Sequence, residues 1–227
     1  MKKYLVMLSL TVFAVVQASC QSSNEKNKEA EIIAQKEVNA VEVPFENGLA
    51  RAYFASGCFW CVEAIYESVK GVKESISGYS GGHTENPTYE ASNTGRTGHA
   101  EAVEIIYDPK VISFSQLVDV YFGSQNSTQV NGQGPDSGSQ YRSIIFYQNA
   151  DQKKIIDTKI AELEKEVGVG KVAAQVLPFE KFWVGENYHQ NFERNNPNHP
   201  YIRAVSIPRL ERFQAKFPEL LKETTSH

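Results

Sequence analysis

Hydrophobic positions follow two different spacings along the chain, and these spacings predict alternating strands and helices. Short runs rich in β-branched and aromatic residues predict strands at residues 51–55, 72–79, 100–107, 141–148 and 172–177. Apolar residues at helical spacing predict helices at residues 59–69, 114–122 and 150–167, with short helical pieces at 186–193 and 208–217. Strands that alternate with helices predict an α/β or two-layer α+β domain with a mixed β-sheet and flanking helices.

Capping residues mark the ends of two of these helices. Ser113, with Gln116 three residues later, predicts a capping box. Asn149 is placed to cap the long helix, and Gly168 stops it. Two polar segments, residues 80–99 and 124–139, are long enough to be functional loops.

The first twenty residues differ from the rest. Two lysines precede a mainly apolar run, residues 4–16, which is typical of a secretory signal and is too short to span a bilayer. The small residues before Cys20 resemble the lipobox of a bacterial lipoprotein, although Gln17 stands where Leu is usual. We therefore expect residues 1–19 to be a lipoprotein signal peptide. Cleavage after Ala18, which would leave a plain periplasmic protein, is the alternative.

The next segment is polar and has almost nothing to bury. Residues 20–42 predict a tether, in which a helix at 29–38 would be marginal without a packing partner. This leaves residues 43–222 for one globular domain of ordinary size. The expected product is an exported protein, either periplasmic or held at a membrane through a lipid on Cys20.

The charge balance limits the partners. A formal net charge of -4 gives no broad positive field, so we expect no nucleic-acid partner. Function must therefore come from a local site.

The cysteines indicate where that site lies. If Cys20 carries lipid, only Cys58 and Cys61 remain, one turn apart at a strand-to-helix junction, where the start of a helix favours a thiolate. A redox pair is favoured over two small buried residues. A zinc site would need a second pair of ligands, and the histidines are scattered singly through the chain.

Two aromatic residues fill the space between the cysteines. Phe59 and Trp60 place apolar surface beside the thiol, which suits an apolar substrate, although core packing is the other interpretation. A substrate with a methyl group to bury and a polar oxygen to protonate would need such a pocket, a thiolate and a proton donor together.

Four motifs give the chain a family resemblance. They are residues 57–60 (Gly-Cys-Phe-Trp), 78–82 (Gly-Tyr-Ser-Gly-Gly), 98–102 (Gly-His-Ala-Glu-Ala) and 136–143 (Asp-Ser-Gly-Ser-Gln-Tyr-Arg-Ser), supported by 86–89 (Asn-Pro-Thr-Tyr) and 188–190 (Tyr-His-Gln). In order and spacing they resemble the A-type peptide methionine sulfoxide reductases, from about Tyr53 to Ala204. The resemblance implies a ferredoxin-like fold and thiol-dependent reduction of methionine S-sulfoxide, free or in proteins, as repair of oxidative damage.

The resemblance also implies roles for single residues. Cys58 would attack the sulfoxide sulfur and Glu101 would donate the proton. The residues implied in substrate binding are Phe59 and Trp60, which would hold the methyl group, Tyr79 and Tyr141, which would donate to the sulfoxide oxygen, and Asp136, which would organise the site. Without the resemblance, Glu101 would be read as a solvent-facing strand residue. Neither a metal nor an organic cofactor is required by this chemistry.

The chain departs from the family pattern in two places. Cys61 stands where the most familiar motif has Gly, and no cysteine follows it, whereas members of the family commonly resolve the sulfenic acid with a cysteine near the C-terminus. We therefore expect a Cys58–Cys61 disulfide, recycled by a thioredoxin-like donor. Residues 125–127 (Gln-Asn-Ser) replace a frequent His-Asp-Pro sequence, which leaves the preference among peptides open. The expected partners are oxidised proteins or peptides, free methionine sulfoxide and the reductant. We expect the protein itself to be a monomer.

Two rival functions remain open at this stage. A general thiol-disulfide oxidoreductase would also carry Cys-x-x-Cys at a helix start, but it would have no need of Glu101, Tyr79 or Tyr141. A non-catalytic surface lipoprotein that binds a partner through its aromatic patch would leave the four motifs unexplained.

Overall fold

The computed structural model describes residues 40–223. The predicted signal peptide, Cys20 and all but the last residues of the predicted tether lie outside this range, so the predictions made for them stay predictions. No helix within the described range is long and apolar enough to cross a membrane.

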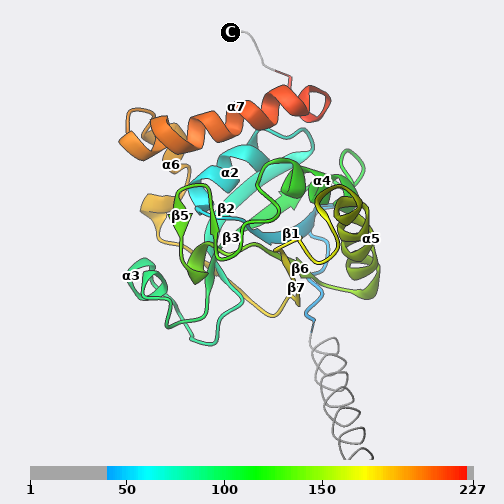
Figure 1. Cartoon of the computed structure of the whole chain (residues 1–227), viewed down its shortest axis with the longest axis horizontal. Coiled ribbons are helices and arrows are strands. Elements are labelled where there is room, and N and C mark those ends of the chain that lie inside the picture. Colours follow the sequence, from blue (N-terminus) through cyan, green and yellow to red (C-terminus); the bar gives the residue numbers. More distant parts are fainter. Residues whose placement is uncertain (1–39, 224–227) are drawn as a thin grey trace, which may run out of the picture. The chain divides into compact units, whose positions relative to one another are not determined.

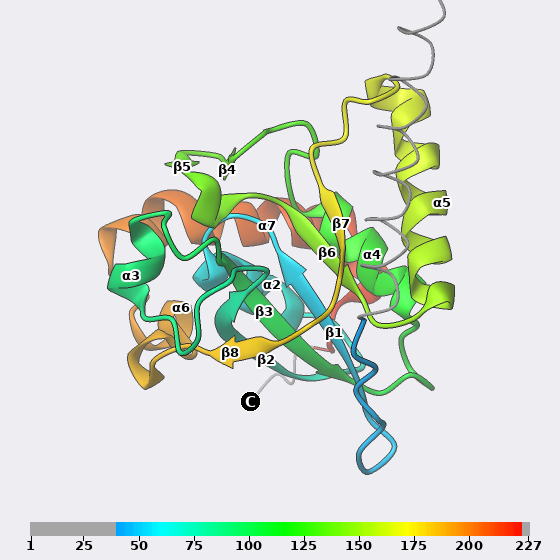
Figure 2. The ribbon, with the colours of Figure 1, turned by 90° about the horizontal axis from the view of Figure 1, so that it is seen from below.

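A mixed six-stranded sheet organises the domain (Figure 2). Its strands, in order across the sheet, are β7 (Gln175–Pro178), β6 (Ile144–Tyr147), β1 (Ala50–Ala55), β3 (Ala100–Tyr107), β2 (Val72–Ser80) and β8 (Phe182–Val184). The β6–β7 pair is parallel and the other neighbouring pairs are antiparallel. A two-stranded ribbon, β4 (Gly132–Gln133) with β5 (Asp136–Ser137), lies apart from this sheet.

The longer helices follow the predicted order. They are α2 (Phe59–Glu67), α4 (Phe114–Gly123), α5 (Ala150–Val167) and α7 (Ile207–Lys216). The shorter pieces are α3 (Tyr89–Asn93), α6 (Phe192–Asn195), the 3-10 turns η1 (Ser139–Tyr141), η2 (Asn187–His189) and η4 (Pro218–Leu220), and the π-helical segment η3 (Ile202–Ser206). Helix α2 lies between the sheet and α7 (Figure 1).

The order β1-α2-β2-β3-α4-β6 is a split βαβ arrangement, because β3 inserts between β1 and β2 and pairs antiparallel with both. This confirms the predicted α/β architecture of ferredoxin-like type, with a mixed sheet and flanking helices.

Both faces of the central strands are covered, which explains why β1 is buried almost throughout. Ala52 and Phe54 point into the larger core beneath the helices, while Tyr53 and Ala55 belong to a second cluster on the other face. In that second cluster the Tyr53 ring stacks on Phe179 with centroids 3.7 Å apart. Alternate side chains of this strand thus pack into two separate cores, one on each face of the sheet, instead of pointing to one core and to solvent.

The capping predictions are confirmed. The Ser113 hydroxyl accepts a hydrogen bond from the Gln116 backbone N–H at 3.2 Å, and the Gln116 side chain accepts one in return from the Ser113 backbone N–H at 3.0 Å. Asn149 caps α5, which ends at Gly168 with a φ of 105°.

Several boundaries differ from the prediction. The strand predicted at 141–148 shrinks to β6 because residues 139–141 form a 3-10 turn, and the strand predicted at 172–177 begins only at residue 175. The loop predicted at 80–99 contains α3, the loop at 124–139 contains the β4–β5 ribbon, and β8 was not predicted at all. Elements of two to five residues are too short to show a period, so only pairing and packing reveal them.

Candidate active site

The two cysteines lie where β1 passes into α2. Cys58 is the N-cap residue of α2 and Cys61 lies in its first turn, with both thiols free and the residues 6% and 1% exposed. Gly57, just before them, has a φ of 75°, and a side chain there would place its Cβ 2.5 Å from Cβ of Gln133. Its backbone N–H donates to the Tyr141 carbonyl at 3.2 Å. Glycine therefore permits the turn that brings the thiol against the loop carrying Tyr141.

Glu101 is buried on β3, directly at the start of α2. Its Oε2 accepts a hydrogen bond from the Phe59 backbone N–H at 3.0 Å, and its carboxyl group also contacts the Cys58 thiol. The residue is only 2% exposed. Burial raises the pKa of Glu101 to about 8, so that the carboxyl group holds a proton at neutral pH beside the thiol.

Aromatic rings surround this point. The Phe59 ring lies 4.7 Å from the His189 ring and 5.8 Å from the Tyr79 ring, measured between centroids. Trp60 stacks on Phe192 at 3.7 Å, and its indole N–H donates to Nδ1 of His189 at 3.1 Å. Because Nδ1 accepts this bond and burial lowers the pKa of His189, the imidazole is neutral with its proton on Nε2. Phe59 and Trp60 thus place an apolar wall of packed rings beside the thiol.

Two phenols from different elements face the same region. Tyr79 on β2 is paired in register with Glu101 on β3, and its hydroxyl donates to Oε2 of Glu186 at 2.8 Å. Glu186 also accepts from the Tyr89 backbone N–H at 2.8 Å. Burial raises the pKa of Tyr79 and of Tyr141 above the ordinary value of a phenol, so both remain donors. The partner of Tyr79, Glu186, was not singled out by sequence reasoning.

Asp136 connects the second cysteine to the first. Its carboxylate accepts from the Tyr201 hydroxyl at 2.6 Å and from the backbone N–H of Cys58. The same Tyr201 hydroxyl lies 3.6 Å from Sγ of Cys61. Burial raises the pKa of Asp136. Tyr201 was missed by sequence reasoning, because a single tyrosine after a proline carries no pattern.

The two thiols share one negative charge. Burial raises the pKa of Cys58 well above that of a free thiol. The hydrogen bond from Cys58, opposed by burial and reinforced by the charge of Arg209, lowers the pKa of Cys61 to about 6. The thiolate expected at this helix start is therefore on Cys61 in the resting protein, while Cys58 keeps its proton. At Cys58 burial outweighs the effect of the helix terminus, and the role of Cys58 as the attacking nucleophile stays a prediction.

The cation beside Cys61 comes from the C-terminal helix. Arg209 on α7 is buried and donates to the Ser56 carbonyl, the Ser56 hydroxyl and the Ser124 carbonyl, each at 2.9 Å. These neutral acceptors leave its positive charge uncompensated by a carboxylate within hydrogen-bonding distance in the described part of the chain. Arg209 was also missed, since it looks like any polar residue of an amphipathic helix.

The unusual loop at residues 125–127 packs against the same turn. Oε1 of Gln125 accepts from the Ser56 hydroxyl at 2.7 Å, and the Asn126 backbone N–H donates to Oε1 of Gln133 at 2.9 Å. A groove of about 730 Å³ runs beside this loop and is bordered by Asp136 and Arg209. The replaced sequence therefore lies against the turn that precedes the cysteine pair.

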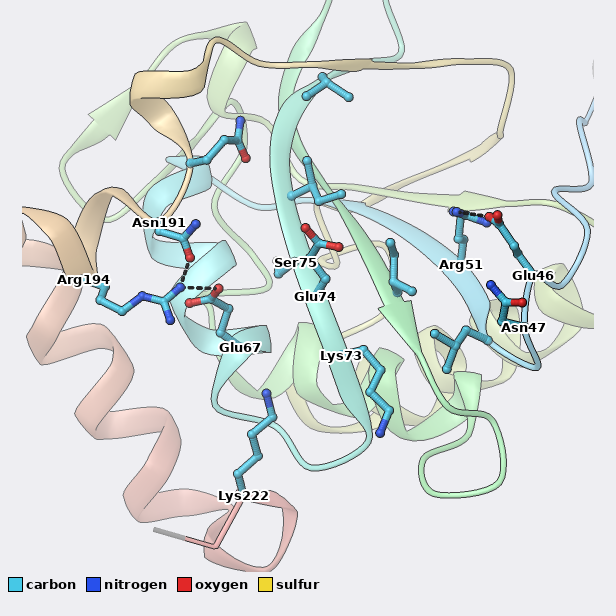
Figure 3. A pocket seen from close by; sticks show the side chains of 15 residues that line it. Glu46, Asn47, Arg51, Glu67, Lys73, Glu74, Ser75, Asn191, Arg194 and Lys222 are labelled. Atoms are coloured by element: carbon cyan, nitrogen blue, oxygen red, sulfur yellow. Dashed lines mark hydrogen bonds and ion pairs between the residues drawn. The ribbon is translucent and has the colours of Figure 1, made fainter. Parts of the chain in front are cut away.

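A second groove, of about 1050 Å³, lies elsewhere and is lined mainly by charged and amide side chains (Figure 3). Ion pairs join Arg51 to Glu46 at 2.9 Å and Arg194 to Glu67 at 3.2 Å on its walls. None of the predicted site residues lines it. Although this groove is large, it is therefore not the reactive site.

The predicted catalytic and binding residues lie together at the start of α2. The Cys58 thiol contacts both the Cys61 thiol and the Glu101 carboxyl group. The other predicted residues surround these three groups: Phe59, Trp60, Tyr79, Asp136 and Tyr141. Across residues 40–223, no group of three or more His, Cys, Asp or Glu side chains is arranged to hold a metal ion. What the arrangement offers is a thiol pair, a protonated carboxyl group and an apolar wall.

Known proteins match this chain over the same region. The family model described as peptide methionine sulfoxide reductase matches residues 50–221. The peptide methionine sulfoxide reductase MsrA of Pasteurella multocida is 45% identical over 172 residues, covering 76% of this chain and 98% of that protein. The MsrA of Saccharolobus solfataricus is also 45% identical, over 75% of this chain and 96% of its own length.

Solved structures agree with the sequence matches. Methionine sulfoxide reductase A of Corynebacterium diphtheriae superposes with a TM-score of 0.60 at 31% identity, covering 68% of this chain and 78% of that one. Reduced Mxr1 of Saccharomyces cerevisiae gives the same TM-score and identity over 69% of this chain and 91% of its own. The matched segment, residues 50–221, contains all eight predicted site residues.

Proposed function

The chain belongs to the peptide methionine sulfoxide reductase A family, and from this premise we propose how its own residues reduce methionine S-sulfoxide to methionine. The observation that carries the proposal is the contact between the Cys58 thiol and a buried, protonated Glu101 inside an aromatic wall. The substrates are methionine sulfoxide in proteins and peptides and the free amino acid.

The first half-reaction uses the thiol pair and the carboxyl group together. Cys58 passes its proton to the Cys61 thiolate along the hydrogen bond between them and attacks the sulfoxide sulfur. Phe59 and Trp60 hold the methyl group, and Glu101 gives its proton to the sulfoxide oxygen. The oxygen ends on Cys58 as a sulfenic acid, and methionine leaves.

The phenols and Asp136 orient the substrate. Tyr79 and Tyr141 donate hydrogen bonds to the sulfoxide oxygen, and for this Tyr79 exchanges its bond to Glu186 for one to the substrate. Asp136 holds the turn at Cys58 through its bond to that residue's backbone N–H. The hydrogen bonds from Tyr79 and Tyr141 strengthen as negative charge develops on the oxygen, which is the condition for catalysis rather than mere binding.

The second half-reaction restores the thiols. We propose that Cys61 attacks the Cys58 sulfenic acid to form a disulfide, and that a thioredoxin-like donor then reduces it. Mass spectrometry after one turnover tests the pairing. The wild-type protein should lose the mass of two hydrogens, whereas a Cys61→Ser variant should instead hold one added oxygen. Disulfide-level mass loss in Cys61→Ser would exclude the proposed pairing.

The reaction type is tested by supplying each epimer of a methionine sulfoxide derivative with a thiol reductant. We expect reduction of the S epimer alone, and none in a Cys58→Ser control. If a folded sample reduces neither epimer, general thiol-disulfide exchange becomes the better account, since a low-pKa thiol in Cys-x-x-Cys would serve that chemistry too.

We also propose that the enzyme is exported as a monomer and anchored through a lipid on Cys20. The apolar run followed by small residues and cysteine supports this. Radiolabelled palmitate should label the wild-type protein and leave a Cys20→Ala variant unlabelled. A mature soluble protein beginning at Ser19 would instead indicate simple cleavage after Ala18.

A further inference from the structure

The resolving thiol is closed off from solvent. Cys61 is 1% exposed, and the titratable or charged groups that face it are Cys58, Glu101, Tyr201 and Arg209. Water therefore has little access to remove a proton from Cys61. Any proton that it must lose has to leave through one of these neighbours or through the Ser206 hydroxyl, which also forms a hydrogen bond with Cys61.

The proposed reaction leaves Cys61 in need of a base. In the resting pair, Cys61 is held as a thiolate first of all by the hydrogen bond from the Cys58 thiol. Once Cys58 has passed on its proton and become a sulfenic acid, that donor is gone and Cys61 is itself protonated. A thiol is a poor nucleophile, so the second half-reaction needs a route for this proton.

The structure provides one route through a tyrosine. The Tyr201 hydroxyl donates to Oδ2 of Asp136 at 2.6 Å and lies 3.6 Å from Sγ of Cys61. Once Cys61 is protonated, its S–H can therefore donate to the Tyr201 oxygen while the Tyr201 proton points to Asp136. Asp136 in turn reaches back to the backbone N–H of Cys58. The chain Cys61, Tyr201, Asp136 therefore begins at the resolving thiol and ends beside the residue whose hydroxyl must leave.

We propose that Tyr201 is a catalytic residue of the second half-reaction, carrying the proton of Cys61 to Asp136. The step rests on the function proposed above, and it balances. The Cys61 sulfur attacks the Cys58 sulfur, so that an S–S bond forms and the S–O bond breaks. The Cys61 proton moves to Tyr201 as the Tyr201 proton moves to Asp136, and Asp136 delivers it to the departing hydroxyl, which leaves as water.

The electrostatics of the site agree with this path. Burial raises the pKa of Asp136, which makes the carboxylate a better proton acceptor than an exposed one. Burial and the neighbouring negative charges raise the pKa of Tyr201 far above that of a free phenol. Tyr201 therefore passes protons without ionising. The positive charge of the buried Arg209 also favours the transient Cys61 thiolate.

Single-turnover kinetics of Tyr201→Phe test the proposal. The phenyl ring keeps the edge contact that Tyr201 makes with Trp60 at 5.9 Å, so methionine formation should stay within about twofold of the wild-type rate. Disulfide formation is measured as the loss of free thiol and of trappable sulfenic acid. Its rate should decrease by about 10²-fold, the usual range for losing a proton-transfer group. Tyr107→Phe, which changes a buried tyrosine outside the site, is the matched control and should alter neither rate.

The pH profile separates a proton relay from a merely structural role. Disulfide formation should be nearly independent of pH between 6 and 9 in the wild type, and should rise with pH in Tyr201→Phe because hydroxide must then replace the relay. In Cys61→Ser, adding Tyr201→Phe should leave the lifetime of the sulfenic acid unchanged.

Three outcomes would overturn the proposal. They are unchanged disulfide formation in Tyr201→Phe, equal slowing of both half-reactions, and a slowed rate with no new pH dependence. If Tyr201→Phe does not fold, Asp136→Asn replaces it, and its disulfide step must show the same rise with pH. Absence of methionine formation in the wild type would instead refute the proposed function itself.

Discussion

Burial sets the chemistry of the single most important acid. Glu101 stands on a strand, where a glutamate ordinarily faces solvent, yet it is 2% exposed because both faces of the sheet are covered. The contacts that compensate for burial are the hydrogen bond from the Phe59 backbone N–H at the start of α2 and the contact with the Cys58 thiol. These are too little to keep a buried carboxylate charged at neutral pH, so the residue is available as an acid.

The pH dependence of the first half-reaction follows from this. Because the pKa of Glu101 is about 8 and its protonated form is the donor, single-turnover methionine formation should fall about tenfold per pH unit above 8. It should also fall below about pH 6, where the Cys61 thiolate that accepts the Cys58 proton becomes protonated, and be constant between these values. Glu101→Gln should keep the hydrogen bond but lose the fall above pH 8. Glu101→Ala should lose about 10²-fold or more in rate.

Asp108→Ala, which removes a carboxylate of the loop after β3, is the control for this series, and its profile should match the wild type. Wild-type turnover in Glu101→Ala would remove Glu101 from the mechanism.

At the scale of elements, α2 is tied to its neighbours by a buried carboxyl group that is not part of the reaction. Glu63 accepts from the Asn191 backbone N–H at 2.5 Å and from the Ser77 hydroxyl, and so joins α2 to β2 and to the start of α6. Burial raises the pKa of Glu63 to about 7. Asn191 has a φ of 55°, a conformation that this contact helps to hold.

We expect Glu63→Gln to change the pH dependence of stability. The pKa of Glu63 is higher in the folded protein than in the unfolded chain, so its contribution is fully present below about pH 4.5 and is lost as the pH rises through 7. Urea unfolding should give similar free energies for both proteins at pH 4. At pH 8, Glu63→Gln should be more stable by up to about 3 kcal/mol. An exposed counterpart, Glu166→Gln, should show no such trend, and a constant difference across pH would contradict the assignment.

The capping box of α4 predicts a stability effect without a catalytic one. Ser113→Ala removes the acceptor for the Gln116 backbone N–H and should lower the free energy of unfolding by about 1 kcal/mol. Ser113→Thr keeps an acceptor and should stay close to the wild type. Activity per folded molecule should be unchanged in both variants, because α4 contributes none of the reacting groups; a loss of activity would show that α4 positions the site.

At the scale of the whole domain, the segment before β1 completes the second core. The Val41 backbone N–H donates to the Phe179 carbonyl at 2.7 Å, and the Val43 backbone N–H donates to Oε1 of Gln148 at 2.8 Å. Val43 also packs against the cluster that contains Tyr53 and Phe179. The described residues just before position 43 therefore make contacts with the domain, and the boundary at residue 43 stays a prediction.

Truncation tests this boundary. A variant beginning at Ala40 keeps all of these contacts and should match the full chain in activity and in the free energy of unfolding. A variant beginning at Phe45 loses three hydrogen bonds, those of the Val41 and Val43 backbone N–H groups and the exposed one from the Asn149 side chain to Glu42, together with the Val43 packing contact. It should be less stable by about 2 kcal/mol in urea. Equal stability of the two variants would show that residues 40–44 contribute nothing to the fold.

Much of the site could be predicted because its signals are local. The spacing of Cys58 and Cys61, the aromatic pair between them and the helical period that follows are all contained in a dozen residues. The period of the strands and the capping residues of α4 and α5 are equally local, since each depends on backbone hydrogen bonds between near neighbours. The sequence by itself therefore determined the order of the longer helices and strands, the place of the thiols and, through its motifs, the family.

Only the tertiary structure decided which distant groups meet the thiols and which thiol holds the charge. Tyr201 reaches Cys61 across 140 positions, and Arg209 reaches Ser56 across 153. Such contacts leave no periodic trace in the chain, because they depend on how α7 and the segment before it pack over α2. The proton balance between Cys58 and Cys61 depends on those same neighbours, since burial and nearby charge, not residue type, set the pKa of a buried thiol.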